Sequence, residues 1–464
     1  MRLKSSISVA ILSIFLVGSL LLSLNTVNRR KSLNEERMFV TENDINLNYN
    51  YFQEYNTDES KVIKYLCSQN IILNKLPPMD SIPLKESSKT LKPGEIPSYV
   101  FQYAPLVHLY TEETYLPYNI EDYVKHFSLK DRKNNTYVDS LTLNQLSRIT
   151  DRTSSDLFLT TKDFIEDGDD PDWLTGIKNI PDLSTGKIKD APATLIVVDK
   201  GNGWVDAYWF YFYSFNLGPF VMGVGPYGNH YGDWEHSLTR FYQGIPVYIW
   251  MSAHGGGNAY HYEALEKFDG DNARPLIFSS RGTHANYAQI GRHSHDLPWG
   301  ILSDFTDKGS LWDPAENYFG YTWDGKNITI IDSKSKNKVD YRELKINKDW
   351  LLFKGKWGDD KLPDWDPRQK WSIFEWKYIE GPTGPLTKNL QRLKLCQTKK
   401  WFHLWGNPCP AKNFLNDINQ GQRDYGYGRC GNLFKWVKWR ALRTILNYLT
   451  WNGGICLFMD RVFG

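Results

Sequence analysis

The sequence predicts a mainly β protein, with an antiparallel β-sandwich-like body and few short helices, preceded by an N-terminal transmembrane segment. Three observations support this fold class. Aromatic residues make up 15% of the 464 residues, and such bulky, flat side chains favour sheets. Short β-branched or aromatic runs alternate with Gly and Pro, while amphipathic helical patterns are sparse. An uncharged apolar stretch lies close to the N-terminus.

The composition divides the chain into four parts. We predict a signal anchor with flanking charges in residues 1–31, a stalk or loosely ordered linker in 32–95, a β-rich domain in 96–395 and a Cys-containing C-terminal extension in 396–464. The linker is polar and has no sustained apolar period, whereas a dense aromatic and aliphatic pattern follows it. The net charge of only +2 gives no indication of a nucleic-acid partner.

The predicted anchor is the apolar stretch 7–24, which contains no charge and just spans a bilayer. It is longer than most signal-peptide cores, and no clear small-x-small pattern follows it, so an uncleaved anchor is favoured over a cleaved signal peptide. Basic residues flank it on both sides, so the positive-inside rule leaves the orientation open. A membrane is therefore the first partner that the sequence predicts.

Sequons and cysteines favour a lumenal body. Asn134 and Asn327 each begin an Asn-x-Thr sequon, which is glycosylated only in the secretory lumen. In an oxidising lumen, two disulfides with three possible connectivities could form among Cys396, Cys409, Cys430 and Cys456. In the cytosol these cysteines would be small core residues. We favour the lumenal alternative, and so predict a single-pass membrane protein of the secretory or vacuolar system.

Five apolar runs in the body are predicted strands. They are residues 193–199, 205–215, 233–242, 247–254 and 275–280. The second run is apolar on both faces, which is typical of a buried central strand. The best helical patterns are at 119–127 and 260–268.

The runs 233–242 and 247–254 are predicted to form an antiparallel hairpin. If the turn between them is tight, residues whose numbers sum to about 488 face each other. This register places His254 within one pairing step of Asp233 and Glu235. The two carboxylates share a face of the strand because side chains alternate with a period of two.

The hairpin carries some of the ionisable residues that we consider candidates for a site around the motif GNHYGDWEH. The candidate metal or ligand residues are His230, Asp233, Glu235, His254 and His284. Imidazole and carboxylate ligands suit a divalent cation such as Ca, Mg, Mn or Zn. The same groups could act as a general acid and base, or form only a structural ion-pair network. No residue is assigned a catalytic role, because the common hydrolase and nucleotide motifs are absent from the sequence.

Six blocks of the sequence resemble the vacuolar protein sorting-associated protein 62 family of fungi. In chain order they are YAPLVHLYTEETYLP (103–117), VDAYWFYFYSFN (205–216), GNHYGDWEH (228–236), RPLIFSSRGTHANYA (274–288), LPWGILSDFTDKGSLWDP (297–314) and GPTGPLTKNL (381–390). The resemblance implies a membrane-linked protein connected with delivery of proteins to the vacuole, and carries over no catalytic activity. We therefore expect the His/Asp/Glu site to bind an unknown protein or glycan ligand.

The motif at 228–236 is also similar to the G-H-R-H-D-W-E signature of the necrosis-inducing secreted proteins. The β-sandwich of those proteins binds a divalent cation, although the spacing here differs at Asn229 and at Tyr231 and Gly232. This likeness implies one alternative function, a cation-dependent binder of membranes or glycans. A metal-dependent hydrolase acting on glycans or lipid head groups is the other alternative.

Overall fold

The structure is a computed structural model, and it describes only part of the chain. The described residues are 89–146, 149, 156–163, 170–220, 225–268, 271–294, 302–331, 348–371, 375–397, 411–412 and 415. All of them belong to one compact unit, which comprises Met79–Trp436 and Leu446–Gly464. The predicted anchor at 7–24, nearly all of the predicted stalk, and Cys409, Cys430 and Cys456 lie outside the described residues. Within the described ranges, no helix is long and apolar enough to cross a membrane.

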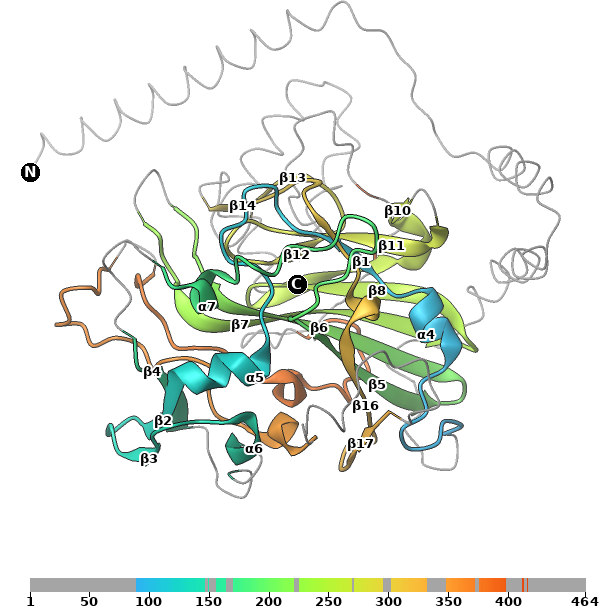
Figure 1. The fold of residues 1–464 in the computed structure, drawn as a ribbon. Coiled ribbons are helices and arrows are strands. Elements are labelled where there is room, and N and C mark those ends of the chain that lie inside the picture. The colour runs from blue at the N-terminus through green and yellow to red at the C-terminus, as the bar shows by residue number, and fades with distance from the viewer. Residues whose placement is uncertain are drawn as a thin grey trace, which may run out of the picture. The chain divides into compact units, whose positions relative to one another are not determined.

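An eight-stranded sheet dominates the fold (Figure 1). In spatial order its strands are β17 (Ile328–Ile330), β16 (Tyr318–Trp323), β5 (Ala193–Gly201), β6 (Trp204–Asn216), β7 (His230–Tyr242), β8 (Ile245–Ala253), β9 (Gly256–His261) and β18 (Ala411–Lys412). Neighbouring strands are antiparallel except for β16 with β5 and β18 with β9. Strand β18 comes from the segment predicted to be a C-terminal extension. The prediction of a mainly β protein with few short helices is confirmed.

The four central strands correspond to four of the predicted runs. Strand β6 is buried along its whole length, as expected for a run that is apolar on both faces. Between β7 and β8, Ser237 pairs with Met251 and Arg240 pairs with Tyr248. The predicted pairing sum of 488 is therefore confirmed for this part of the hairpin.

A second sheet packs on one face of the large sheet. Its strands are β10 (Lys267–Phe268), β11 (Asp271–Ser279), β1 (Leu106–His108) and β15 (Leu311–Trp312), with β12 (Asn286–Tyr287) also paired to β11. Val107, Ile277 and Trp312 of this sheet share a buried core with Leu195 and Met251 of the large sheet. A separate hairpin joins β13 (Gly291–Ser294) to β14 (Ser303–Thr306). This core positions β11 and β12, and His284 lies in the turn between these two strands.

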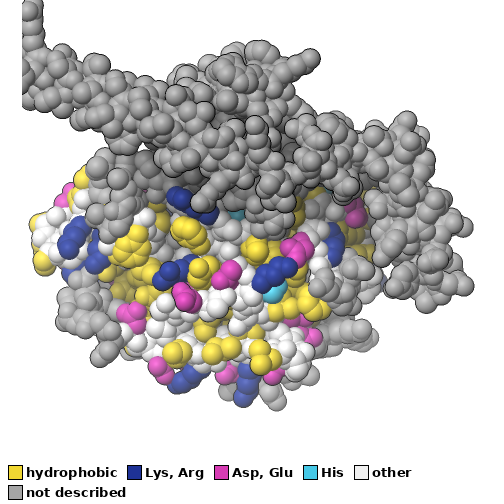
Figure 2. All heavy atoms as spheres, turned by 90° about the horizontal axis from the view of Figure 1, so that it is seen from above, with side chains coloured by type: hydrophobic (Ala, Val, Ile, Leu, Met, Phe, Trp, Pro, Cys, Tyr) yellow, Lys and Arg dark blue, Asp and Glu magenta, His cyan; other side chains and the backbone are white. Residues whose placement is uncertain are grey.

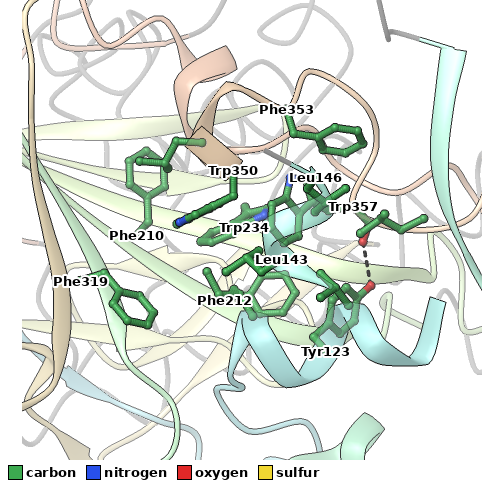
Figure 3. Close-up of a cluster of buried hydrophobic side chains, with 14 of the residues drawn as sticks. Tyr123, Leu143, Leu146, Phe210, Phe212, Trp234, Phe319, Trp350, Phe353 and Trp357 are labelled. Atoms are coloured by element: carbon green, nitrogen blue, oxygen red, sulfur yellow. Dashed lines mark hydrogen bonds between the residues drawn. The ribbon is translucent and has the colours of Figure 1, made fainter. Parts of the chain in front are cut away.

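The opposite face of the large sheet is covered by a third layer. Its strands are β3 (Thr136–Val138), β2 (Phe127–Asp131) and β4 (Leu157–Thr161). Under them Trp234 packs against Trp350 and Trp357, with ring centroids 6.1 and 5.3 Å away (Figure 3). The Tyr123 hydroxyl donates to the Trp357 carbonyl at 2.7 Å (Figure 3). Because β-strand side chains alternate, the large sheet contributes to a core on each face.

The helices are all short. They are α4 (Ser98–Gln102), α5 (Ile120–Tyr123), α6 (Leu143–Leu146), α7 (Asp172–Thr175) and the 3-10 turns η4 (Val124–His126), η7 (Tyr262–Ala264), η9 (Pro314–Glu316), η10 (Asp349–Leu352) and η11 (Pro385–Lys388). The helix predicted at 119–127 is α5 followed by η4, and the Asn119 side chain caps it. The helix predicted at 260–268 is wrong, because Tyr260 is buried in the core as part of β9.

A buried ion cluster joins the large sheet to the chain segment that follows η11. Asp206 of β6 accepts two hydrogen bonds from Arg240 of β7, at 2.7 and 2.8 Å. Lys200 donates to the carbonyls of Leu390 and Arg392 at 2.6 and 3.2 Å. Burial lowers the pKa of Lys200 to about 8. Burial opposes ionisation of Asp206, but Arg240 and Lys200 hold its pKa below the usual range. The cluster thus holds the backbone at Leu390 and Arg392 against the sheet.

Removing one member of this cluster should destabilise the whole body. We expect Asp206→Asn to lower the free energy of unfolding by about 3–5 kcal/mol, because it leaves buried cations uncompensated. Urea unfolding followed by intrinsic tryptophan fluorescence measures this change. Lys178→Gln is the matched control, since its pair with Asp172 is largely exposed and should contribute less than about 1 kcal/mol. Equal stability of the two variants would contradict the assignment.

Candidate ligand-binding site

The motif GNHYGDWEH forms the first half of β7 and the turn before it. Gly232 lies within the strand with φ +64°, and a Cβ there would approach the Trp357 carbonyl oxygen to 2.1 Å. Only glycine fits this close approach of two backbones. Gly228 precedes the strand with φ +81°. The two glycines therefore set the path of the strand that presents the ionisable side chains.

The β7–β8 ladder ends at the pair Ser237 and Met251. One step further, the Ser252 hydroxyl accepts the His236 backbone N–H at 2.7 Å and donates to the Glu235 carboxylate. Beyond Ser252 the chain turns, because His254 has a left-handed backbone with φ +52°. The two strands consequently part at the point where the carboxylates lie.

A pocket of about 590 Å³ opens where the strands part. Its lining includes four of the five predicted residues, His230, Asp233, Glu235 and His254. The opposite wall comes from the segment 375–397, which contributes Lys388. The remaining lining residues are Asn216, Pro219, Tyr227, Gly228, Trp234, His236, Ser252, Gly255, Gly256, Thr283, Leu302, Glu375, Ile379, Pro382 and Gln397. The predicted cluster thus borders a cavity large enough for a small ligand.

His284, the fifth predicted residue, lies behind Asp233 and is fully buried. Its Nδ1 contacts Asp233 Oδ2 at 3.0 Å, and its Nε2 lies 3.7 Å from Glu113 Oε1. The ring also stacks on Tyr213 with centroids 3.7 Å apart. Burial alone would lower the pKa of His284, but the bonds to Asp233 and Glu113 raise it to about 9. A cationic imidazole therefore holds Asp233 in place at neutral pH.

Glu235 lies in a different electrostatic environment from Asp233. Burial, reinforced by the nearby charge of Asp233, raises the pKa of Glu235 well above its usual value. Burial also lowers the pKa of Lys388, although Glu235 and Asp233 oppose that shift. Glu235 thus favours its neutral form, next to an Asp233 carboxylate that faces a cationic imidazole. One wall of the pocket presents two chemically distinct carboxyl groups.

The two other histidines have their own partners. His230 Nδ1 contacts the Gly232 carbonyl at 2.8 Å, and burial lowers its pKa. His254 Nε2 lies 2.6 Å from Asp304 Oδ2 rather than reaching Asp233 or Glu235 through the ladder. Asp304 also accepts the hydroxyls of Tyr287 and Thr283 at 2.7 and 2.8 Å. The register argument predicted His254 beside Asp233 and Glu235, but the His254 ring contacts Asp304 of the β13–β14 hairpin instead.

The donor arrangement does not fit a bound metal as it stands. Across the residues that the structure describes, no group of three or more His, Cys, Asp or Glu side chains is arranged to hold a metal ion. Asp233 faces His284, and Glu235 faces Ser252. Candidate cations such as Ca, Mg, Mn or Zn therefore stay a prediction from the sequence alone.

Sequence reasoning missed the residues that other segments bring to the site. Glu113, Ser252, Asp304 and Lys388 lie far from the motif in the chain or carry no motif of their own. His236, which was not among the candidates, stacks on Phe210 with ring centroids 4.7 Å apart. Glu113, Asp304 and Lys388 lie within blocks that resemble the fungal family, and Ser252 lies within the predicted strand 247–254.

The predicted modification sites are described only in part. Asn134 and Asn327 are both exposed in turns. Cys396 is disulfide-bonded, and the three other predicted cysteines lie outside the described ranges.

The raised pKa of His284 makes part of the stability pH-dependent. Its stabilising contribution is complete below its ordinary pKa of 6.5 and is lost as the pH rises through about 9. We expect the stability advantage of the wild type over His284→Gln to fall across this window by about 3 kcal/mol. Urea unfolding at several pH values measures it. His261→Gln is the control, because burial lowers the pKa of His261. A pH-independent difference between wild type and His284→Gln would overturn the assignment.

Comparison with known proteins identifies the family. Residues 79–358 match the family described as vacuolar protein sorting-associated protein 62. The chain is 46% identical to "Vacuolar protein sorting-associated protein 62" of Saccharomyces cerevisiae, with 85% of this chain and 88% of that protein covered. It is 47% identical to "Putative vacuolar protein sorting-associated protein TDA6" of the same yeast, with 83% and 88% covered.

A solved structure described as "Toxin fold for microbial attack and plant defense" is similar at a TM-score of 0.23 and 13% identity, over 53% of this chain and 82% of that one. The family match and the two yeast relatives confirm the resemblance seen in the sequence blocks. The chain belongs to the vacuolar protein sorting-associated protein 62 family.

Proposed function

We propose that this protein is a membrane-anchored component of vacuolar protein sorting that binds a ligand in the pocket of Asp233 and Glu235 without transforming it. Membership of the family supports the role in vacuolar protein sorting. The observation that carries the binding role is the pair of unlike carboxyl groups on one wall of the pocket. A built polar site of this kind at the end of a rigid sheet is typical of ligand binding.

The chemistry of the wall favours a hydroxyl-rich ligand such as a glycan. Asp233, which contacts His284, offers carboxyl oxygens as acceptors, whereas Glu235, whose pKa burial raises, favours the protonated form and can donate. A sugar hydroxyl can both donate and accept, so neighbouring hydroxyls match such a pair. Apolar lining residues such as Tyr227 and Ile379 suit the C–H faces of a sugar ring.

Substituting the two carboxyl groups should weaken ligand binding. We expect Asp233→Asn combined with Glu235→Gln to weaken glycan binding by about tenfold or more, since charged hydrogen bonds contribute about 1.5–3 kcal/mol each. Glycan-array binding of the full chain in detergent measures the loss. In cells, the same variant should missort a vacuolar hydrolase precursor.

Asp364→Asn is the matched control, because the Asp364 side chain is 66% exposed and does not line the pocket. Normal precursor maturation in cells that express only the double variant would contradict the proposal. Unchanged glycan binding by that variant would exclude the pocket as the binding site.

One observation also favours a second candidate function. General acid–base hydrolysis uses two carboxyl groups in unlike environments; burial raises the pKa of Glu235, and Asp233 contacts His284. Release of a reducing sugar from bound oligosaccharide, lost in Glu235→Gln, would support a hydrolase. Binding or turnover that a chelator abolishes would instead indicate the cation-dependent alternatives predicted from the sequence.

We further propose that residues 7–24 anchor the chain and that the body lies in the lumen. The exposed turns at Asn134 and Asn327 are accessible to a glycosyltransferase. We expect glycosidase treatment to increase the gel mobility of the expressed protein, and Asn134→Gln and Asn327→Gln each to remove one mobility step. Asn202→Gln, in an exposed turn outside any sequon, should remove none. A wild-type protein insensitive to glycosidase would contradict the lumenal orientation.

A further inference from the structure

Lys388 carries an ammonium group on the wall of the pocket. Among the residues that the structure describes, this group takes part in no hydrogen bond and no ion pair. Its charge interacts only at longer range, with the carboxyl groups of Glu235 and Asp233 and with the ammonium group of Lys356. A lysine that is largely withdrawn from water normally has an acceptor next to its charge. Lys388 is therefore a cation that a ligand in the pocket can complement.

The acidic residues of the pocket leave this cation uncompensated. Three described acidic residues line the cavity. Asp233 contacts the His284 imidazole at 3.0 Å, so its carboxylate already has a cationic partner. Burial raises the pKa of Glu235, so the uncharged form of this carboxyl group is favoured. Glu375 is exposed, and water and salt screen its charge. None of the three is a direct counter-ion of Lys388.

The described interior behind this wall carries more positive than negative charge. Burial raises the pKa of Asp206, but Arg240, Lys200 and Arg392 together hold it below the usual range. Three cations thus surround one carboxylate. The Arg392 guanidinium lies 4.8 Å from the centre of the Trp250 ring, and its Nη2 has no hydrogen-bond partner among the described residues. On the face of the molecule that Figure 2 shows, by contrast, acidic and basic side chains are interspersed.

The excess of positive charge extends to the pocket at His236. This residue lines the cavity and is almost completely buried. Burial lowers the pKa of His236 well below its usual value, and the charges of Arg392 and Lys388 lower it further. His236 is therefore a neutral imidazole between two cations. The side of the pocket formed by His236 and Lys388 is electropositive, which favours an anionic group on a ligand.

The backbone around Lys388 is held in place from within the core. The Lys388 carbonyl, at the end of η11, accepts a hydrogen bond from Arg392 Nη1 at 2.9 Å. Asn389 follows with a left-handed φ of +52°, and Lys200 donates to the Leu390 carbonyl at 2.6 Å. A cation on such a fixed support loses less conformational freedom on binding than one on an unsupported loop.

We propose that the ligand of the pocket is an acidic saccharide and that Lys388 binds its carboxylate or phosphate group. The inference rests on the proposed binding of a hydroxyl-rich ligand by Asp233 and Glu235, and it adds a negative charge to that ligand. An anion supplies the acceptor that the Lys388 ammonium group lacks, and hydrogen bonds between ions of opposite charge are stronger than those between neutral groups. A neutral saccharide would instead cover the Lys388 cation without pairing it, which is unfavourable.

The test uses the full chain in detergent on an array that pairs neutral glycans with forms differing only by a carboxylate or a phosphate. We expect the acidic member of at least one pair to bind about tenfold or more tightly than its neutral counterpart, as is typical of one hydrogen bond to a charged group. Added sodium chloride should weaken binding of the acidic member only. The preferred member distinguishes a uronic acid from a sugar phosphate.

Lys388→Gln should lower the affinity for the acidic member to that for the neutral member, and leave the neutral member unaffected. Intrinsic tryptophan fluorescence verifies that this variant is folded. Lys354→Gln is the matched control, because Lys354 is exposed and does not line the pocket. If Lys388 served only as a distant counter-ion of the pocket carboxyl groups, Lys388→Gln would change the binding of both members equally, and that result would overturn the inference.

The wild type alone also tests the inference. Equal affinity for the two members of every pair would overturn it, whatever the variants do. The proposed function would survive that result if Asp233→Asn combined with Glu235→Gln still weakened binding of both members. A wild type that binds neither neutral nor acidic glycans would contradict the proposed glycan binding together with this inference.

Discussion

The ion pair between Asp206 and Arg240 is the contact on which the candidate site depends. It lies between the two central strands, and Arg240 also donates to the Leu393 carbonyl at 2.6 Å. Lys200 holds the neighbouring carbonyls of the same segment. That segment forms one wall of the pocket and carries Lys388. A charge cluster in the core thus determines where a wall of the site lies, because buried cations hold the segment through its backbone.

The site itself depends on the different surroundings of Asp233 and Glu235 on strand β7. Asp233 faces a cationic His284, while Glu235 lies closer to the point where the strands part and contacts Ser252. Asp233 and Glu235, two residues apart on the same strand face, therefore have different electrostatic environments because their neighbours come from different segments. Such differentiation does not require a metal, and it needs no helix dipole. It arises from β-sheet alternation combined with unequal burial.

Much of the fold could be predicted from the sequence because strand signals are local. The runs that correspond to β5 to β8 are recognisable from their composition. The predicted pairing sum of about 488 holds from Ser237 to Arg240, and the register shifts by one residue at the bulge between Arg240 and Phe241. The helix expected at 260–268 failed because its apolar spacing reflects burial of Tyr260 in a strand. Periodicity in a short window cannot distinguish these two causes.

The candidate site could be predicted only on its β7 side. His230, Asp233 and Glu235 lie close together in the chain, so the motif was visible. Lys388 reaches the pocket through contacts across more than a hundred residues, and no local pattern reports such a contact. His254 was expected beside the carboxylates, but its left-handed backbone directs it to Asp304. A register argument holds only as far as the ladder continues.

The point at which β7 and β8 separate also determines the depth of the cavity. Ser252 is the first residue of β8 that no longer pairs with β7, although it still pairs with Gly257 of β9, and its hydroxyl bridges to His236 and Glu235 of β7. A family member whose ladder extended one pair further would have a shallower cavity on the same fold, and one whose ladder ended earlier would have a deeper one. The depth of the cavity thus depends on a single backbone pairing, while the sheet and its cores do not.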